Sequence, residues 1–273
     1  LPMKPTTQAT GFNTILYAGN SASQTMTNVG FAPDLVWYKR RTGSNDHTLI
    51  DSVRGGAYAL SANGTAAEYG FGGNNLSFTS TGFTLTDTGT QTNASGQNYV
   101  AWCWDAGSST VTNGTGALSA QVRANPSTGF SIATWTGNGA VTTVGHGLGV
   151  APKLVIVKNR DYAVNWNVWV TGFSGDEYLV LNSSAAKASY TNNWGSTPTT
   201  DVFGVGNNNG TNGNTNDMVA YSFADVTGYQ KIGSYTGNGS ATGPTVTTGF
   251  RPAFLLIKRT DTTGTWAICN KKR

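Results

Sequence analysis

The chain carries the stretch Ala32-Pro33-Asp34-Leu35-Val36-Trp37-Tyr38-Lys39-Arg40. It repeats this pattern as Ala151-Pro152-Lys153-Leu154-Val155-Ile156-Val157-Lys158-Asn159-Arg160 and as Arg251-Pro252-Ala253-Phe254-Leu255-Leu256-Ile257-Lys258-Arg259. Each copy joins a proline, a short apolar run and a basic end. Because proline lacks an amide donor, it stands at the start of a strand or on an edge. The run is rich in β-formers and too short for a buried helix, which predicts a core strand whose basic end faces water.

The repeat extends on both sides of this strand. Upstream, each copy begins with glycine and an aromatic residue and then reaches a turn of glycine and asparagine, residues that tolerate a positive φ. Several landmark pairs share one spacing of 119 residues: Pro33 and Pro152, Asn63 and Asn182, and Val100 and Val219. A common spacing at separate landmarks indicates tandem copies of one unit.

These landmarks divide the chain into five parts. We expect an extended N-terminal arm (1–10), a first β-sandwich repeat (11–107), a linker rich in Ser, Thr and Gly (108–128), a second repeat (129–227) and the first half of a third repeat (228–273). Half a sandwich leaves an open sheet edge and a bare apolar face. We therefore expect the natural chain to continue beyond Arg273, and completion by another chain is the alternative.

The composition favours strands over helices. The 273 residues include 36 Gly, and Asn, Thr and Ser are abundant. Turn signals at intervals of roughly 8–12 residues predict an all-β, helix-poor fold of tandem antiparallel β-sandwiches, with Ig-like and jelly-roll topologies both open. The expected strands are Thr14–Tyr17, Leu35–Lys39, Thr48–Asp51, Ala57–Ser61, Ser77–Thr79, Phe83–Thr86, Tyr99–Trp104, Ser131–Trp135, Leu154–Lys158, Asn167–Val170, Tyr178–Leu181, Asp201–Val205 and Met218–Phe223.

The segment Tyr99–Trp104 is apolar on both faces. This pattern indicates a central strand, or a strand covered by a neighbouring domain or by another chain.

Charge is sparse in this sequence. Charged residues make up 11% of the chain, and the net charge is +4. The cations do not form the clusters that track nucleic-acid phosphates, so no nucleic-acid partner is expected. No apolar stretch approaches the roughly 20 residues of a membrane-spanning helix, so no membrane insertion is expected. The two cysteines, Cys103 and Cys269, do not support a disulfide framework, and Cys103 is expected to be a small buried thiol.

The sequence holds no recognisable catalytic or metal-binding constellation. His47 and His146 are the two histidines, and both are interpreted as structural. Zinc would need clustered Cys and His, and a glycosidase would need a paired set of carboxylates; neither pattern is present. Asp51 and Arg54 are interpreted as a local salt bridge. The Asn- and Gly-rich loop 206–217 is interpreted as a flexible turn and not as a calcium site. No catalytic residue, metal or cofactor is therefore expected, and the protein is not expected to be an enzyme.

Aromatic residues at loop edges are the candidates for binding a ligand. Their flat rings suit the apolar faces of sugars, and core packing is the alternative interpretation. The candidate positions are Tyr69, Phe71, Tyr162, Tyr190 and Trp194.

Several motifs together resemble a known family. They are Gly30-Phe31-Ala32-Pro33-Asp34-Leu35-Val36-Trp37, Asp51-Ser52-Val53-Arg54-Gly55, Tyr99–Trp104, Val219–Asp225, Tyr235-Thr236-Gly237-Asn238-Gly239 and Gly249-Phe250-Arg251-Pro252. This combination resembles a repeat module of virion and tail-fibre-like proteins of marine bacteriophages, including cyanophages, and it covers nearly the whole chain from Gly11. The second repeat departs from the pattern because it lacks an Asp-Ser-Val-Arg-Gly equivalent. The resemblance implies a location in the virion and transfers no catalytic residue.

The expected function is therefore that of a structural virion protein, a tail-fibre or capsid-fibre segment that presents β-sandwich domains for host attachment. Its expected partners are other virion proteins, further copies of itself (a homotrimer, by analogy with fibres) and a host-surface glycan. It would be assembled in the host cytoplasm and carried on the extracellular particle. The alternatives are a head-decoration protein without receptor contact and a free lectin-like module.

Overall fold

A computed structural model describes residues 11–70, 75–86, 89 and 91–272. The expected N-terminal arm (1–10) lies outside this part of the chain. Strands dominate the described residues, every pair of adjacent strands is antiparallel, and the one helix is α1 (Asn209–Asn212). The expectation of an all-β, helix-poor sandwich fold is confirmed.

The first repeat forms a six-stranded sheet and a smaller sheet. The large sheet has the order β1 (Phe12–Ala18), β9 (Asn98–Trp104), β3 (Leu35–Arg40), β4 (Thr48–Asp51), β5 (Tyr58–Ser61) and β6 (Tyr69–Gly70). The small sheet has the order β2 (Gln24–Met26), β8 (Gly82–Leu85) and β7 (Leu76–Thr79). A core that includes Ile15, Tyr38, Ile50 and Phe83 lies between them.

The second repeat follows the same plan. Its strands β12 (Phe130–Thr136), β19 (Asp217–Phe223), β14 (Leu154–Asn159), β15 (Asn167–Val170), β16 (Glu177–Val180) and β17 (Ala188–Ser189) lie side by side in the order of their counterparts. β13 (Thr142–Gly145) and β18 (Val202–Val205) form the smaller sheet. The registers also agree, since Leu35 faces Asp51 and Leu154 faces Val170.

The stretch expected as a linker contains two strands. β10 (Val111–Asn113) and β11 (Ala120–Asn125) extend the large sheet of the second repeat beyond β12. Ala120 and Val122 are buried, whereas Gln121 is exposed and Arg123 is half-buried. This alternation is that of a strand with one buried face, so the segment belongs to the second repeat and does not span a gap.

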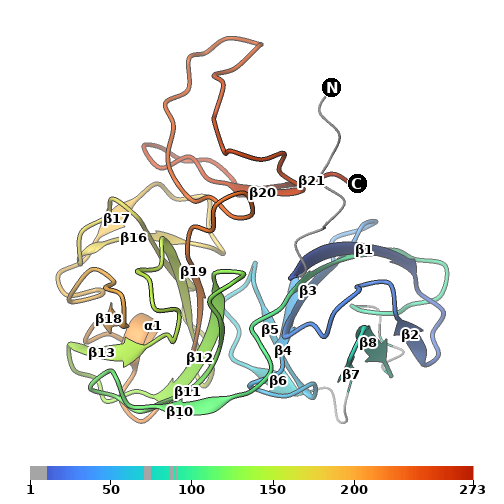
Figure 1. The fold of residues 1–273 in the computed structure, drawn as a ribbon, viewed down its shortest axis with the longest axis horizontal. Coiled ribbons are helices and arrows are strands. Elements are labelled where there is room, and N and C mark those ends of the chain that lie inside the picture. The colour runs from blue at the N-terminus through green and yellow to red at the C-terminus, as the bar shows by residue number, and fades with distance from the viewer. Residues whose placement is uncertain (1–10, 71–74, 87–88, 90, 273) are drawn as a thin grey trace.

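The third repeat contains one strand pair, β20 (Phe254–Ile257) and β21 (Ala267–Asn270), which corresponds to β3 and β4. The segment 229–253 begins like β1 and β12 but forms no strand and projects outward (Figure 1). β1 and β12 pair with β9 and β19, and the described part of the third repeat has no strand of that type. A strand without a partner leaves its backbone groups to water, which explains why none forms here.

All three repeats contribute to the largest core. It joins Trp102 and Trp104 of the first repeat to Trp166 and Tyr221 of the second, and Phe254 of the third packs against it. β9 turns these tryptophans toward this core and turns Ala101 and Cys103 toward the small sheet. β9 is thus a central strand covered by neighbouring repeats of the same chain, and Cys103 is a buried thiol, as expected.

One expectation about the basic strand ends is wrong. Lys158 is fully buried and does not face water. Its ammonium group donates to the carbonyl oxygens of Asn159 (2.7 Å) and Tyr162 (3.0 Å). Lys39 and Lys258 make the same bond to the carbonyl of the next residue, each at 2.7 Å. The lysine therefore closes the turn after the strand.

Candidate functional site

The repeats are joined by a hydrogen bond that occurs twice. Trp166, just before β15, is buried and donates its indole N–H to the carbonyl oxygen of Ser61 at 2.9 Å. Trp266, just before β21, donates to the carbonyl oxygen of Val180, also at 2.9 Å. Ser61 ends β5, and Val180 ends its counterpart β16. Each later repeat therefore contacts the preceding one through the same pair of positions.

His47 holds the corresponding position in the first repeat. Its Nδ1 accepts a hydrogen bond from the indole N–H of Trp37 at 3.0 Å, and its ring stacks on Trp102. This geometry fits the structural role expected for His47.

A buried ionic cluster also crosses the boundary between the first two repeats. Arg54 binds Asp51 (2.5 Å) and Glu68 (2.7 Å), and its side chain is fully buried. The hydroxyl of Tyr221, in the second repeat, donates to Asp51 at 2.7 Å. Arg160 donates to both carboxylate oxygens of Glu68, at 3.0 and 2.7 Å. The expected bridge between Asp51 and Arg54 is confirmed, and it is one part of an inter-repeat network that also recruits Tyr221 and Arg160.

The network changes how its members titrate. Burial alone raises the pKa of Glu68, but the hydrogen bonds from Arg160 and the charge of Arg54 outweigh burial and leave this pKa below its ordinary value. Burial likewise opposes the charge on Arg54, yet Asp51, Tyr221 and Glu68 raise its pKa. Glu68 and Arg54 therefore both carry their charges at neutral pH.

A second ion pair connects β11 to the first repeat. Arg123 lies 2.6 Å from a carboxylate oxygen of Asp34 and donates to the carbonyl oxygen of Gly107 at 2.9 Å. Asp34 also accepts from the hydroxyl of Ser52 (2.7 Å) and the amide of Ala106 (2.8 Å). Burial raises the pKa of Asp34, although the hydrogen bond from Ser52 and the positive charge of Arg123 oppose this effect.

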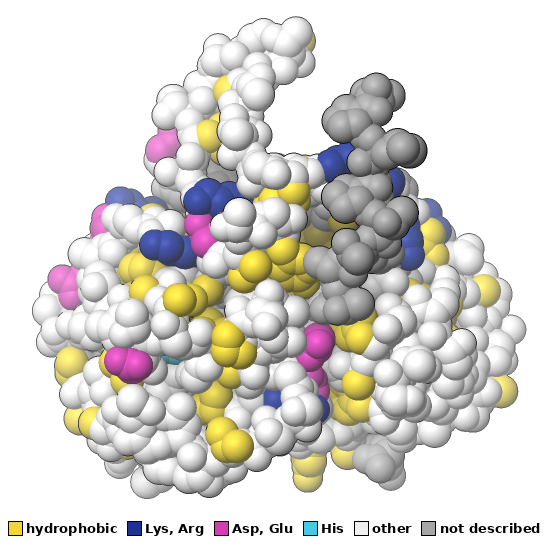
Figure 2. Space-filling view, viewed as in Figure 1, with side chains coloured by type: hydrophobic (Ala, Val, Ile, Leu, Met, Phe, Trp, Pro, Cys, Tyr) yellow, Lys and Arg dark blue, Asp and Glu magenta, His cyan; other side chains and the backbone are white. Residues whose placement is uncertain are grey.

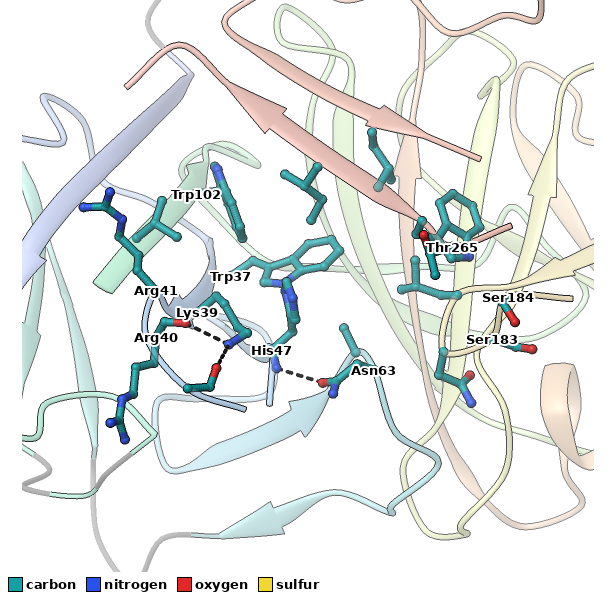
Figure 3. A pocket seen from close by; sticks show the side chains of 18 residues that line it. Trp37, Lys39, Arg40, Arg41, His47, Asn63, Trp102, Ser183, Ser184 and Thr265 are labelled. Carbon is teal, nitrogen blue, oxygen red and sulfur yellow. Dashed lines mark hydrogen bonds between the residues drawn. The ribbon is translucent and has the colours of Figure 1, made fainter. Parts of the chain in front are cut away.

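A pocket of about 510 Å³ opens where the three repeats meet. Trp37 and Trp102 lie on one side of it, and Ser183, Ser184 and Thr265 on the other (Figure 3). Its apolar lining comes from all three repeats and includes Trp37, Val100, Trp102, Leu181, Leu256 and Ile268. This volume is within the range of known ligand pockets. We call it the junction pocket.

The surface of the second repeat carries a shallower depression of about 270 Å³. Its lining is rich in asparagine and tyrosine: Val164, Asn165, Asn167, Tyr178, Tyr190, Asn193, Asn208, Asn209 and Gly210. The side chain of Asn208 caps α1 and also donates to the side-chain oxygen of Asn193 at 3.1 Å. Asn193 is 3% exposed, and its Nδ2 is buried without a hydrogen-bond partner among the described residues. We call this feature the asparagine depression.

The five aromatic candidates have different environments. Tyr190 lines the asparagine depression and is 53% exposed, and Tyr162 is also exposed, in the turn closed by Lys158. Tyr69 is half-buried and packs against the core of the first repeat. Trp194 is 1% exposed inside the second repeat, so the expectation that it stacks on a ligand is wrong. Phe71 lies outside the described residues.

The loop 206–217 is more ordered than a flexible turn. It contains α1, and Thr211 and Asn212 of this helix are buried. Asn212 accepts from the indole N–H of Trp135 at 3.2 Å, and the carbonyl of Asn209 accepts from Asn159 at 2.9 Å. The loop therefore forms a packed wall of the asparagine depression.

His146 has the structural role expected of it. His146 is fully buried, and its Nδ1 accepts from the amide of Leu148 (3.1 Å) while Nε2 lies 3.2 Å from the carbonyl oxygen of Thr199. Burial lowers the pKa of His146, so its ring is neutral at pH 7. Within the described ranges, no cluster of three or more His, Cys, Asp or Glu is arranged to hold a metal ion. None of the helices described is both long and apolar enough to cross a membrane.

Charged side chains are few on the face shown in Figure 2, where most of the described surface belongs to the backbone and to side chains that are neither hydrophobic nor charged. Residues 7–273 match the family described as a domain of unknown function, DUF7483, and this range includes all three repeats. The chain belongs to the DUF7483 family. Comparisons with curated proteins and with solved structures gave no match.

Proposed function

We propose that this DUF7483 chain is a structural virion protein, a segment of a bacteriophage tail fibre or capsid fibre that carries β-sandwich repeats toward the host surface. The observation that supports this proposal best is the inter-repeat bond that occurs first between Trp166 and Ser61 and again between Trp266 and Val180. A contact that recurs at equivalent positions arranges repeats in a fixed relative orientation. Repeats held in a fixed orientation form a rigid unit, and a rigid unit suits a segment of an attachment fibre.

The buried polar groups favour the same role. The cluster around Arg54 and the pair between Arg123 and Asp34 both connect one repeat to another. Burying charges costs free energy unless each charge is paired, so these groups define a specific docking geometry between repeats. The motif Asp51–Gly55, which carries part of the resemblance to phage proteins, contributes two members of this cluster.

The test is to locate the chain on a particle. Antibodies raised against the recombinant chain would be applied to purified phage that encodes it, and the labelled particles imaged by electron microscopy. We expect labelling of fibres, with threefold density if the fibre is a homotrimer. Label confined to capsid faces would indicate head decoration and contradict the fibre role. Particles that carry no label, and in which mass spectrometry finds no peptide of this chain, would overturn the virion role.

A second candidate function, carbohydrate binding, is favoured by the asparagine depression. It combines the exposed ring of Tyr190 with amide groups of Asn165 and Asn167, and with the buried Nδ2 of Asn193 that has no protein partner among the described residues. A stacking ring beside hydrogen-bonding amides is a chemistry that recognises sugars. On a glycan array, the multimerised chain should bind, and Tyr190→Ala should lose the signal. Tyr235→Ala is the matched control, because Tyr235 is also 53% exposed but lies in the third repeat.

A further inference from the structure

A single turn, Tyr190–Asn193, carries two of the side chains that line the asparagine depression. The amide of Asn193 donates to the carbonyl oxygen of Tyr190 at 2.9 Å, and Asn192 within the turn has a φ of 59°. Asparagine tolerates a positive φ at this position of a turn, so the sequence suits the conformation. Tyr190 is 53% exposed and Asn193 is 3% exposed, so the turn holds an accessible ring close to a buried amide.

Helix α1 determines which way the amide of Asn193 points. The side-chain oxygen of Asn208 accepts from the amides of Gly210 (2.9 Å) and Thr211 (3.2 Å), so the Nδ2 of Asn208 is the atom that faces Asn193. This Nδ2 donates to the side-chain oxygen of Asn193 at 3.1 Å. The group of Asn193 that has no partner among the described residues is therefore its Nδ2, which is a donor. Buried donors are nearly always hydrogen-bonded, so this one indicates an acceptor atom on a bound molecule.

A second donor in the lining is defined in the same way. The side-chain oxygen of Asn182 accepts from the amide of Trp166 at 2.9 Å, and its Nδ2 donates to the side-chain oxygen of Asn165, also at 2.9 Å. Asn165 is exposed and lines the depression, so it offers its own Nδ2 to a ligand. The two amide donors of Asn165 and Asn193 both require acceptor oxygens.

The lining carries no formal charge, because it consists of asparagine, tyrosine, valine and glycine residues. A carboxylate supports the turn from outside this lining. Asp176 accepts from the amide of Asn192 at 2.7 Å, and its carbonyl oxygen accepts from the amide of Tyr190 at 3.0 Å. The negative charge of Asp176 repels an anionic ligand, and the lining has no cation to pair with one. The depression therefore favours an uncharged ligand.

The size of the depression suits one sugar ring. Its volume of about 270 Å³ is smaller than that of pockets that enclose drug-sized molecules. The exposed ring of Tyr190 provides a flat apolar surface, which matches the apolar face of a pyranose. Uncharged sugars also carry several oxygen atoms that accept hydrogen bonds from amides.

We infer that the asparagine depression binds one uncharged pyranose residue of a glycan, with the apolar face of the sugar on Tyr190 and one of its oxygen atoms accepting from Nδ2 of Asn193. The inference rests on the proposed carbohydrate-binding function and adds the class of sugar to it. The acceptor is a hydroxyl oxygen in a neutral hexose or the acetamido carbonyl oxygen in an N-acetylhexosamine. Sugars that carry a carboxylate or a sulfate are disfavoured.

The test is an NMR titration of the isotope-labelled chain with monosaccharides at neutral pH and constant ionic strength. The uncharged probes are glucose, galactose, mannose, fucose, N-acetylglucosamine and N-acetylgalactosamine, and the acidic probes are glucuronic acid and N-acetylneuraminic acid. We expect an uncharged sugar to shift the side-chain amide signals of Asn193 in a saturable way. Acidic sugars should bind about tenfold more weakly or not at all. Comparing hexoses with N-acetylhexosamines identifies the acceptor oxygen.

The role of the Asn193 donor is tested by Asn193→Asp. This variant keeps an oxygen for the bond from Asn208 and replaces the Nδ2 donor by a second oxygen, so uncharged sugars should bind about tenfold more weakly. If it does not fold, the signals of Asn193 in the parent chain decide the point, because a sugar that accepts from Nδ2 must shift them.

The preference for uncharged sugars is tested by adding a cation to the lining. Asn209→Lys places a positive charge at an exposed residue of the depression, and we expect acidic sugars to bind about fivefold more tightly. Asn207→Lys is the matched control, because Asn207 is exposed in the same loop but lies outside the lining, and it should leave the binding of acidic sugars unchanged.

The outcomes separate this inference from the function on which it rests. Acidic sugars that bind as tightly as uncharged ones, or an unchanged selectivity in Asn209→Lys, would overturn the inference while carbohydrate binding stands. So would a sugar whose binding is lost in Tyr190→Ala but leaves the side-chain signals of Asn193 unmoved. Failure of every sugar in the panel to bind would overturn both.

Discussion

Arg160 of the second repeat binds Glu68 of the first through two hydrogen bonds, one from Nε at 3.0 Å and one from Nη2 at 2.7 Å. The backbone adds a third bond, because the amide of Glu68 donates to the carbonyl oxygen of Arg160 at 2.6 Å. A bidentate arginine–carboxylate pair fixes both distance and orientation. The two repeats are therefore held in one relative position at this point.

Removing the central cation of this cluster should destabilise the whole chain. Arg54→Met leaves Asp51 buried without its cation, and we expect a loss of about 3–5 kcal/mol in the free energy of unfolding. Urea unfolding followed by circular dichroism measures this loss. Arg259→Ala is the control, because its pair with Asp261 is exposed to solvent, so we expect its removal to leave the unfolding curve unchanged. Equal effects of the two substitutions would contradict the role given to the cluster.

Acid should weaken the same junction. The pKa of Glu68 is lower in the folded chain than its ordinary value of 4.5. Its contribution to stability is therefore complete above pH 4.5 and is lost as the pH falls through the folded pKa. Glu68→Gln should be less stable than the parent at pH 7, and this difference should shrink on acidification. Thermal melts from pH 7 to pH 3 provide the measurement, and a difference that stays constant with pH would refute the prediction.

Alkaline pH should have the opposite effect at Lys158. Burial lowers its pKa from 10.5 to about 8. Between these values the unfolded chain binds more protons than the folded chain, so this group makes the free energy of unfolding rise with pH. Lys158→Met should lack that part of the rise. Comparing melting temperatures of the parent and the variant at pH 7.5 and 9.5 isolates the effect, and parallel pH profiles would show that Lys158 does not cause it.

The tryptophan contact predicts a graded pair of variants. Trp166→Phe removes the indole N–H and leaves the carbonyl of Ser61 without its donor, which should cost about 1–3 kcal/mol. Trp266→Phe should reduce the free energy of unfolding by less, because Trp266 is only half-buried and water can replace its N–H as the donor to the carbonyl of Val180. Both are measured by urea unfolding. A larger effect at Trp266 than at Trp166 would contradict this reasoning.

Two aromatic residues should separate stability from ligand binding. Trp194→Ala removes a buried indole from the second core and should cost about 3–5 kcal/mol. Tyr190→Ala removes an exposed ring and should change stability by less than about 0.5 kcal/mol, while it alters the asparagine depression. Melting temperatures distinguish the two cases. A strongly destabilised Tyr190→Ala variant would show that this ring contributes to the stability of the fold, which would contradict the prediction.

Much of the fold could be predicted from the sequence, because the same strand and turn patterns occur in more than one repeat and support one another. The spacing that links Pro33 to Pro152 also links β4 to β15, β5 to β16 and β9 to β19, and every strand expected from periodicity is present. β10 and β11 were harder to predict, since their polar residues are typical of a linker. Only the pairing of β11 with β12 in the structure reveals that β11 has a buried face. The short strands β6 and β17 have only two residues each and leave no periodicity to read.

The junctions between repeats were beyond sequence reasoning. Arg160 ends a strand like any basic residue, and only the packing of the repeats brings it to Glu68. Lys158 gave the same misleading signal, because a lysine that closes a turn reads like one that faces water. Trp194 sits in a polar loop, yet it is buried because that loop folds back over the second core. Each case depends on contacts between residues far apart in the chain.

The shared core has a consequence for how such a chain can be inherited. Its side chains come from all three repeats, in addition to the separate cores that the first and second repeats enclose on their own. Recombination that exchanged one repeat with a relative would mismatch side chains at every contact with the other two. Substitutions in this core must therefore be compensated across repeats, and the heritable unit of exchange is the complete set.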